Sequence, residues 1–222
     1  MKPIAIYWRN AVPNPAKVVI ILEELGLPYQ SKWLELEELK QPAFESVNPN
    51  GRVPAIIDPN TNITLWESGA IVAYLVETYD KDEKITYTSF PEKYLLQQWS
   101  YYQASGQGPY FGQAAWFNKF HHEKLHSAQE RYGNEILRVV GVLDSALKDK
   151  EWLVGTKCTY ADLAFVMWNI NIDFVMASGP VKWDIEAFPH FKEWMDAMKA
   201  RPSVAMAMKS LQEKEIKSEG KI

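Results

Sequence analysis

Two short stretches carry residue types that together could bind a small peptide. Pro54 stands inside an apolar run from Val53 to Ile57, where a proline is unusual, and this predicts a cis Val53–Pro54 bond. Such a bond would turn the N–H and C=O of Val53 toward an extended peptide ligand. Ser68 is predicted to cap a helix whose start favours a carboxylate, and Glu67 could hold an ammonium group. The predicted ligand is a zwitterionic head group on a peptide backbone; the alternative is a hairpin and a capped helix that bind nothing.

A third stretch matches a metal-binding signature. His122 and His126 are spaced as H-E-x-x-H, which on a helix puts both imidazoles on one face for zinc. A zinc site also needs a third protein ligand, and the two other histidines, His121 and His190, form no recognisable third-ligand motif. We therefore expect a solvated helix surface and no metal here, with zinc-dependent hydrolysis as the open alternative.

The composition argues against several classes of function. The chain has 222 residues, of which 47% are hydrophobic and 23% charged, as in ordinary globular proteins. Its net charge of -4 predicts no nucleic-acid partner, and no apolar run reaches the length of a membrane span. Cys158 is the only cysteine, which excludes an internal disulfide, and the apolar run within residues 1–7 is too short for a signal peptide. We expect a cytoplasmic protein that does not bind membranes.

Strand and helix patterns alternate in the first part of the chain. The expected elements are a strand at 4–7, a helix opened by Asn14 as N-cap and Pro15 and ended by Gly26, a strand at 29–36, a partly helical segment at 37–45, strands after Pro54 and at 63–65, and a helix from Ser68. This alternation predicts a small α/β layer fold over residues 1–82. Residues 80–91 are polar and form the predicted linker.

Strand signals nearly vanish after the linker. We therefore expect an all-helical domain over residues 92–210 and a charged tail at 211–222. Helical patterns lie at 95–103, with an interruption near 106–109, then at 128–147, at 188–199 and, as a short extra turn, from 202. Thr159 and Asp162 have the spacing of a capping box at the start of a further apolar helix.

Several motifs in this order resemble one known family. The segments that carry the resemblance are VPNPAKV at 12–18, LEELG at 22–26, NPNGRVPA at 48–55, WESGAI at 66–71, ERY at 130–132 and AD at 161–162. Over roughly residues 4–208, the chain resembles the cytosolic glutathione transferases. Within that family it is similar to the fungal subclass, which resembles the yeast nitrogen-catabolite regulator and the bacterial nu class. The resemblance implies a thioredoxin-like N-terminal domain followed by an all-α domain. One departure is Pro15, where relatives commonly have glycine.

The resemblance also implies roles for individual residues around glutathione. Asn14 matches the asparagine placed near the sulfur, where its amide N–H groups and the helix N-terminus would stabilise the thiolate. Tyr7 and Asn10 are the rival donors, because other transferases use a hydroxyl near the first strand. Glu67 and Ser68 would hold the γ-glutamyl head, and Val53, before Pro54, would pair with the cysteinyl unit.

The glycyl end of glutathione is less well matched. Relatives usually have Gln or His before a basic residue, whereas this chain has Leu39 followed by Lys40. Lys40 alone would then meet the glycyl carboxylate, with Arg52 nearby. As a lone charge in a polar stretch, Lys40 is equally compatible with solvated surface.

Function is expected to follow from this site. We expect a homodimeric transferase with glutathione as cosubstrate, either for conjugation to hydrophobic electrophiles or for reduction of disulfides or peroxides. A glutathione-binding regulator or carrier with little turnover is the alternative. A hydrophobic second substrate is expected between the two domains, among aromatic side chains that could equally form core: Trp8, Tyr110, Phe111, Trp116, Phe117 and Trp168.

Overall fold

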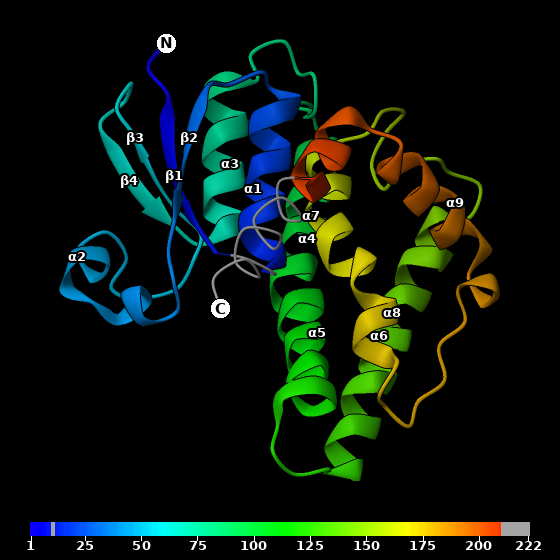
Figure 1. The fold of residues 1–222 in the computed structure, drawn as a ribbon. Coiled ribbons are helices and arrows are strands. Elements are labelled where there is room, and N and C mark those ends of the chain that lie inside the picture. The colour runs from blue at the N-terminus through cyan, green and yellow to red at the C-terminus, as the bar shows by residue number, and fades with distance from the viewer. Residues whose placement is uncertain (10–11, 210–222) are drawn as a thin grey trace. The chain divides into compact units, whose positions relative to one another are not determined.

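The computed structural model describes residues 1–9 and 12–209, and the chain divides into two units (Figure 1). The first unit contains Met1–Thr86 together with the C-terminal segment that begins at Arg201, and the second contains Tyr87–Ala200. The predicted α/β region and helical region correspond to these two units. Residues 201–209 pack with the first unit, whereas the sequence assigned them to the helical domain. The predicted charged tail at 211–222 lies outside the described residues.

The first unit is built on a four-stranded mixed sheet. Its strands are β1 (Ile4–Trp8), β2 (Tyr29–Trp33), β3 (Ala55–Asp58) and β4 (Ile63–Trp66). They lie in the order β2-β1-β3-β4; β1 and β2 are parallel, and β3 is antiparallel to both β1 and β4. Strand β2 is shorter than predicted. It lies at the sheet edge and pairs with β1, which ends at Trp8 opposite Trp33, so the ladder has no partner to extend it.

Helices cover this sheet on both sides. Helices α1 (Pro13–Glu24) and α3 (Ser68–Tyr79) lie side by side against one face (Figure 1). The 3₁₀ helix η1 (Glu37–Lys40) and the short α2 (Pro42–Glu45) confirm the partly helical segment. The residues of β1 alternate: one set is fully buried, while Tyr7, on the other face, packs against Phe44 of α2 with ring centroids 5.5 Å apart.

A partly buried ion pair joins the C-terminal segment to α1. The guanidinium of Arg201 donates two hydrogen bonds of 2.8 Å to the carboxylate of Glu24, and the Ser203 hydroxyl donates a third of 2.5 Å. Helical residues 202–209 follow, as the extra turn at Pro202 predicted, and bury Val204 and Ala207 completely. These polar and apolar contacts explain why this segment belongs to the first unit.

The second unit is entirely helical over its described residues. Its α-helices are α4 (Glu92–Tyr102), α5 (Gly108–Ala115), α6 (His126–Leu147), α7 (Tyr160–Ile170), α8 (Ile172–Met176) and α9 (Pro189–Lys199), with a 3₁₀ turn η4 (Ile185–Ala187). The predicted interruption near 106–109 is not a break. A π-helical turn, η2 (Gln103–Gln107), joins α4 to α5, and a second one, η3 (Trp116–Phe120), follows α5. A wider turn accommodates the glycines and proline without ending the helix.

The predicted capping box at α7 is confirmed. Both reciprocal hydrogen bonds between Thr159 and Asp162 are present. The buried Asp162 carboxylate also accepts from the Leu153 N–H at 2.9 Å and from the Trp194 indole N–H at 3.0 Å. This carboxylate therefore organises the start of α7 and two neighbouring segments. None of the helices in the described part of the chain is long and apolar enough to cross a membrane.

Candidate functional site

The strand directions bring the predicted site residues to one end of the sheet. Because β1 and β4 are each antiparallel to β3, they run in the same direction. Ala55, the first residue of β3, lies opposite Tyr7 of β1 and opposite Trp66 of β4. The end of β1, the start of β3 and the end of β4 therefore lie at the same end of the sheet. Helix α1 follows β1 in the chain and α3 follows β4, so both helices begin near this end. Two helix N-termini and a strand start converge there, an arrangement suited to anionic and peptide groups.

The peptide bond between Val53 and Pro54 is cis, as predicted. Pro54 is buried, and Val53 is half-buried. The β1–β3 and β3–β4 pairings begin at Ala55, so Val53 precedes the ladder. Val53 is thus placed just before the strand, where a peptide ligand would need its main chain.

Glu67 and Ser68 are adjacent at the start of α3, but their helix positions differ from the prediction. Glu67, not Ser68, is the N-cap, because its carbonyl accepts the first helical hydrogen bond from the Ile71 N–H at 2.9 Å. Ser68 is the first helical residue and is buried. Glu67 has a backbone φ of +68°, which is strained for a residue with a side chain. Such strain concentrates at ligand sites, and the Glu67 side chain is exposed.

Asn14 lies in the first turn of α1 and is not the N-cap. Helix α1 begins at Pro13, with Val12 as N-cap, because a proline is well suited to the first helical position. Asn14 is half-buried at the sheet end where α1 starts. Of its rivals, Tyr7 lies on β1 against α2, and Asn10 lies outside the described residues.

A compact loop positions Lys40 and Arg52. The Lys40 ammonium donates a 2.8 Å hydrogen bond to the Asn50 carbonyl, and the side chains of Lys40 and Arg52 are both exposed. Gly51 lies beneath Lys40 with a φ of +59°; a Cβ there would come within 2.6 Å of the Lys40 Nζ. This close approach and the positive φ require glycine at position 51.

Lys17 is a charged residue near this site that sequence reasoning missed. It is only 2% exposed on α1, three positions after Asn14, so the two side chains share a helix face. Burial lowers the pKa of Lys17 to about 7, although the negative charge of Glu67 acts to raise it. A lysine followed by five apolar residues was the available signal for its burial. A desolvated lysine with a charge partner is a feature of functional sites.

The aromatic residues expected around a second substrate fall into different environments. Trp8 is 1% exposed and Phe111 is fully buried, so both are core residues and not free walls of a pocket. Trp116, in contrast, is 51% exposed. Spacing alone could not separate these cases, because an aromatic residue is equally suited to a core and to a binding surface.

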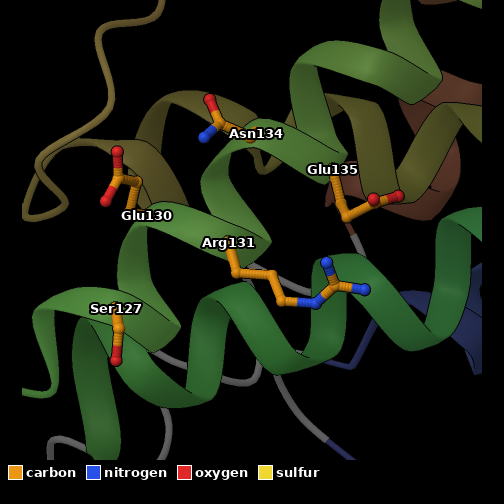
Figure 2. A pocket seen from close by; sticks show the side chains of 5 residues that line it. All are labelled: Ser127, Glu130, Arg131, Asn134 and Glu135. Carbon is orange, nitrogen blue, oxygen red and sulfur yellow. The ribbon is translucent and has the colours of Figure 1, made fainter.

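A polar recess on α6 contains none of the predicted site residues. It has a volume of about 320 Å³ and is lined by side chains from α6 alone: Ser127, Glu130, Arg131, Asn134 and Glu135 (Figure 2). Its walls lack the apolar surface of a typical small-molecule pocket. It is a concavity of an exposed polar helix face.

The H-E-x-x-H stretch does not form the expected helix. Residues 122–125 are not helical, and α6 begins at His126 with Leu125 as N-cap. The two imidazoles therefore do not share a helix face as the metalloprotease signature requires. Within 1–9 and 12–209 no group of three His, Cys, Asp or Glu side chains is arranged to hold a metal ion.

The first unit has a mixed sheet with two helix N-termini and a cis proline at one end, and a helical unit follows it. This arrangement is a thioredoxin-like fold with an appended α-domain. Residues 13–78 match the N-terminal domain of glutathione S-transferases, and residues 108–202 match their C-terminal domain. The chain therefore belongs to the glutathione S-transferase family.

Similar proteins come from fungi. A glutathione S-transferase-like protein of Aspergillus fumigatus is 48% identical, with 94% of this chain and 96% of the relative aligned. The transcriptional regulator URE2 of Saccharomyces cerevisiae is 35% identical over 92% of this chain and 67% of its own length. The crystal structure of the glutathione transferase URE2P5 from Phanerochaete chrysosporium has a TM-score of 0.92 and 40% identity, covering 99% of both chains. The predicted fold class and the resemblance to the fungal subclass are confirmed.

Proposed function

We propose that this protein is an active glutathione transferase that binds glutathione at the sheet end described above. The observation that carries the proposal is the common register of Tyr7, Ala55 and Trp66, which brings the starts of α1, β3 and α3 together. Solved relatives support glutathione as the cosubstrate, because Ure2p was crystallised in complex with glutathione and URE2P6 with oxidised glutathione.

Each end of glutathione has a matching group at this site. Glu67 accepts from the γ-glutamyl ammonium, while Ser68 and the start of α3 hold its carboxylate. The main chain of Val53 pairs with the cysteinyl unit. Lys40, with Arg52 nearby, attracts the glycyl carboxylate.

Asn14 is the proposed catalytic residue. Only the thiolate of glutathione is a good nucleophile, so the protein must lower the pKa of the bound thiol. The Asn14 amide donates to the sulfur, and the N-terminus of α1 adds positive potential. Cys158, the only cysteine of the chain, is buried in the helical unit, so glutathione supplies the reacting sulfur.

The test is a titration of the bound thiol by ultraviolet absorbance together with turnover. Asn14→Ala should raise the pKa of the thiol and slow turnover at neutral pH. Each unit by which the pKa rises corresponds to about 1.4 kcal/mol less stabilisation of the thiolate. Glutathione affinity should fall less, because the other contacts remain. Asn14 is not the N-cap, and Asn14→Ser tests whether a hydroxyl can replace the amide.

Two control variants address the rival donors. Asn10→Ala and Tyr7→Phe should keep most of the activity and the low thiol pKa. If Asn14→Ala titrates like the wild type while either control shifts upward, the donor lies on the first strand or loop and the assignment of Asn14 is wrong.

Two chemistries compete at this site. Conjugation to hydrophobic electrophiles is supported by a relative, Ure2p5, cocrystallised with 1-(S-glutathionyl)-2,4-dinitrobenzene. Glutathione-dependent reduction is supported by relatives crystallised with oxidised glutathione. Rates with an aryl halide, a hydroperoxide and a mixed glutathione disulfide distinguish them. Glutathione binding without turnover in all three assays would favour a regulator, like the transcriptional regulator URE2 of Saccharomyces cerevisiae.

We also propose that the protein is a cytoplasmic homodimer. Large apolar side chains are exposed just before α4 and along it: Phe90, Tyr94, Leu95 and Tyr101. A second copy would bury them. Light scattering should give twice the mass of 25.6 kDa for the wild type and a monomer for Tyr101→Lys; a monomeric wild type would contradict the proposal. A fluorescent fusion should locate to the cytoplasm, where glutathione keeps thiols reduced.

A further inference from the structure

Asn48 is a buried polar residue beside the proposed glutathione site. It lies in the loop between α2 and β3 and is only 1% exposed. Burying an amide side chain is costly unless its donor and acceptor both find partners. The contacts of Asn48 therefore show what the side chain stabilises.

Every polar group of Asn48 has a hydrogen-bond partner in this loop or in α2. Its side-chain Nδ2 donates to the Arg52 carbonyl at 2.5 Å, and its Oδ1 accepts from the Asn50 N–H at 2.9 Å. Its own N–H donates to the Phe44 carbonyl, and its carbonyl accepts from the Gly51 N–H, both at 2.9 Å. Asn48 thus ties the loop to α2 on one side and to the residues before Val53 on the other.

The bond to the Arg52 carbonyl fixes the direction of the next N–H. The Arg52–Val53 peptide is trans, so its C=O and N–H point in opposite directions. Since the Arg52 carbonyl points at the buried Asn48 side chain, the Val53 N–H points away from it. This is the N–H that the proposed function assigns to the cysteinyl unit.

The surroundings hold Asn48 rigidly. Phe44, to which its N–H is bonded, is 3% exposed and belongs to a small apolar cluster with Leu39 and Ala55, against which Tyr7 and Val53 also pack. Because the amide is held by packed groups, its bond can orient the Arg52–Val53 peptide before any ligand arrives. Pre-organisation of this kind lowers the entropy that binding must pay.

We propose that Asn48 is a positioning residue for glutathione: by holding the Arg52 carbonyl beneath the loop, it aims the Val53 N–H at the cysteinyl carbonyl of the ligand. This inference rests on the proposed function. Asn48 itself touches no ligand atom, so it acts on glutathione affinity and not on the chemical step.

The variant that tests the proposal is Asn48→Asp. Aspartate has nearly the same shape and still accepts from the Asn50 N–H, but it cannot donate to the Arg52 carbonyl. Glutathione should bind about tenfold more weakly and its KM should rise accordingly, as for one lost hydrogen bond. The kcat at saturating glutathione should stay within about twofold, because Asn14 and the second substrate are unaffected. A merely structural role would lower kcat through loss of folded protein and leave KM unchanged.

A glutathione analogue isolates the N–H itself. In the analogue a methylene replaces the cysteinyl carbonyl, so the Val53 N–H has nothing to donate to. The wild type should bind this analogue about tenfold more weakly than glutathione. Asn48→Asp should bind the two ligands with affinities that differ by about twofold or less, because its bond from the Val53 N–H to the cysteinyl carbonyl is already lost. Calorimetry on both proteins gives the four affinities.

Asn60→Asp is the matched control. Asn60 is also a turn asparagine of the first unit, and its Nδ2 donates to the Lys2 carbonyl and to Asp58, both at 2.9 Å. It follows the far end of β3, so its replacement removes comparable bonds without touching the Val53 loop. This control should keep the wild-type glutathione affinity and discrimination even if it lowers the melting temperature.

The outcomes separate the inference from the proposed function. A wild type that does not bind glutathione overturns both. The role of Asn48 alone is overturned if the wild type binds glutathione and Asn48→Asp still discriminates tenfold between glutathione and the analogue. It is equally overturned if the variant loses kcat at an unchanged KM. If Asn48→Asp does not fold, Asn48→Ser gives the same comparison, because its shorter hydroxyl cannot span both partners; full discrimination by that variant would equally refute the proposal.

Discussion

Replacing the buried Lys17 by methionine should stabilise the folded protein in a pH-dependent way. Burial lowers the pKa of Lys17 from its ordinary value of 10.5 to about 7. The difference of about 3.5 pH units corresponds to about 5 kcal/mol, at about 1.4 kcal/mol per unit. Methionine has a similar length and carries no charge, so Lys17→Met removes this cost.

The sign of the pH dependence follows from proton binding. Between about pH 7 and 10.5 the unfolded chain holds the Lys17 proton while the folded protein releases it. Because the unfolded state then binds more protons, the unfolding free energy of the wild type rises with pH by up to about 1.4 kcal/mol per unit. Below pH 7 both states are protonated and the full penalty remains. The stability advantage of Lys17→Met should therefore be greatest at or below neutral pH and shrink toward pH 10.

Urea unfolding at several pH values between about 6 and 10 measures this difference directly. Lys32→Met is the control: this lysine is exposed on β2, so its replacement removes no buried charge and should give a difference that does not change with pH. A pH-independent difference for Lys17→Met, or one that grows in alkali, would refute the reasoning. A stabilised variant would indicate that Lys17 is retained for a reason other than stability.

Three further outcomes are expected. Glu67→Ala should weaken glutathione binding about tenfold or more, because a charged hydrogen bond is lost; unchanged affinity in calorimetry would count against the site. Gly51→Ala should lower the melting temperature and raise the glutathione KM more than Gly26→Ala, since both have positive φ but only a Cβ at 51 meets other atoms; equal effects would contradict the crowding argument. Burial acts to raise the pKa of Asp58, but hydrogen bonds from Tyr79, Asn60 and Tyr74 hold this pKa below its ordinary value of 3.8. The ionised Asp58 therefore stabilises the folded protein fully above about pH 4, and this contribution is lost as the pH falls through the pKa of the folded state. Tyr79→Phe should lower stability at neutral pH by about 1 kcal/mol and make its loss in acid shallower, measured by urea unfolding down to about pH 2; an unchanged acid slope would refute this.

The sequence determined the features that depend on local chemistry. A proline within an apolar run indicated the cis bond at Val53–Pro54, and the spacing of Thr159 and Asp162 indicated the capping box. Both depend on a few neighbouring residues, whose backbone preferences are strong. The order of strands and helices likewise followed from periodicity.

Local rules failed at the two helix starts. Asn14 and Ser68 are good capping residues, yet both lie one or two positions inside their helices. At α1, Pro13 has no N–H and a backbone angle suited to the first helical position, so it begins the helix. At α3, Glu67 has a positive φ that its own side chain does not favour, and only the packed surroundings can impose it.

Burial and long-range partners were decided only by the tertiary structure. The apolar run after Lys17 signals burial but does not identify the charge that its side chain meets, and no spacing indicates that Asn48 spans a loop. The pair formed by Glu24 and Arg201 joins positions 177 residues apart, and it assigns the C-terminal segment to the first unit. The physical reason is that periodicity and caps reflect a residue's immediate neighbours, whereas desolvation and hydrogen-bond partners depend on groups that only folding brings together.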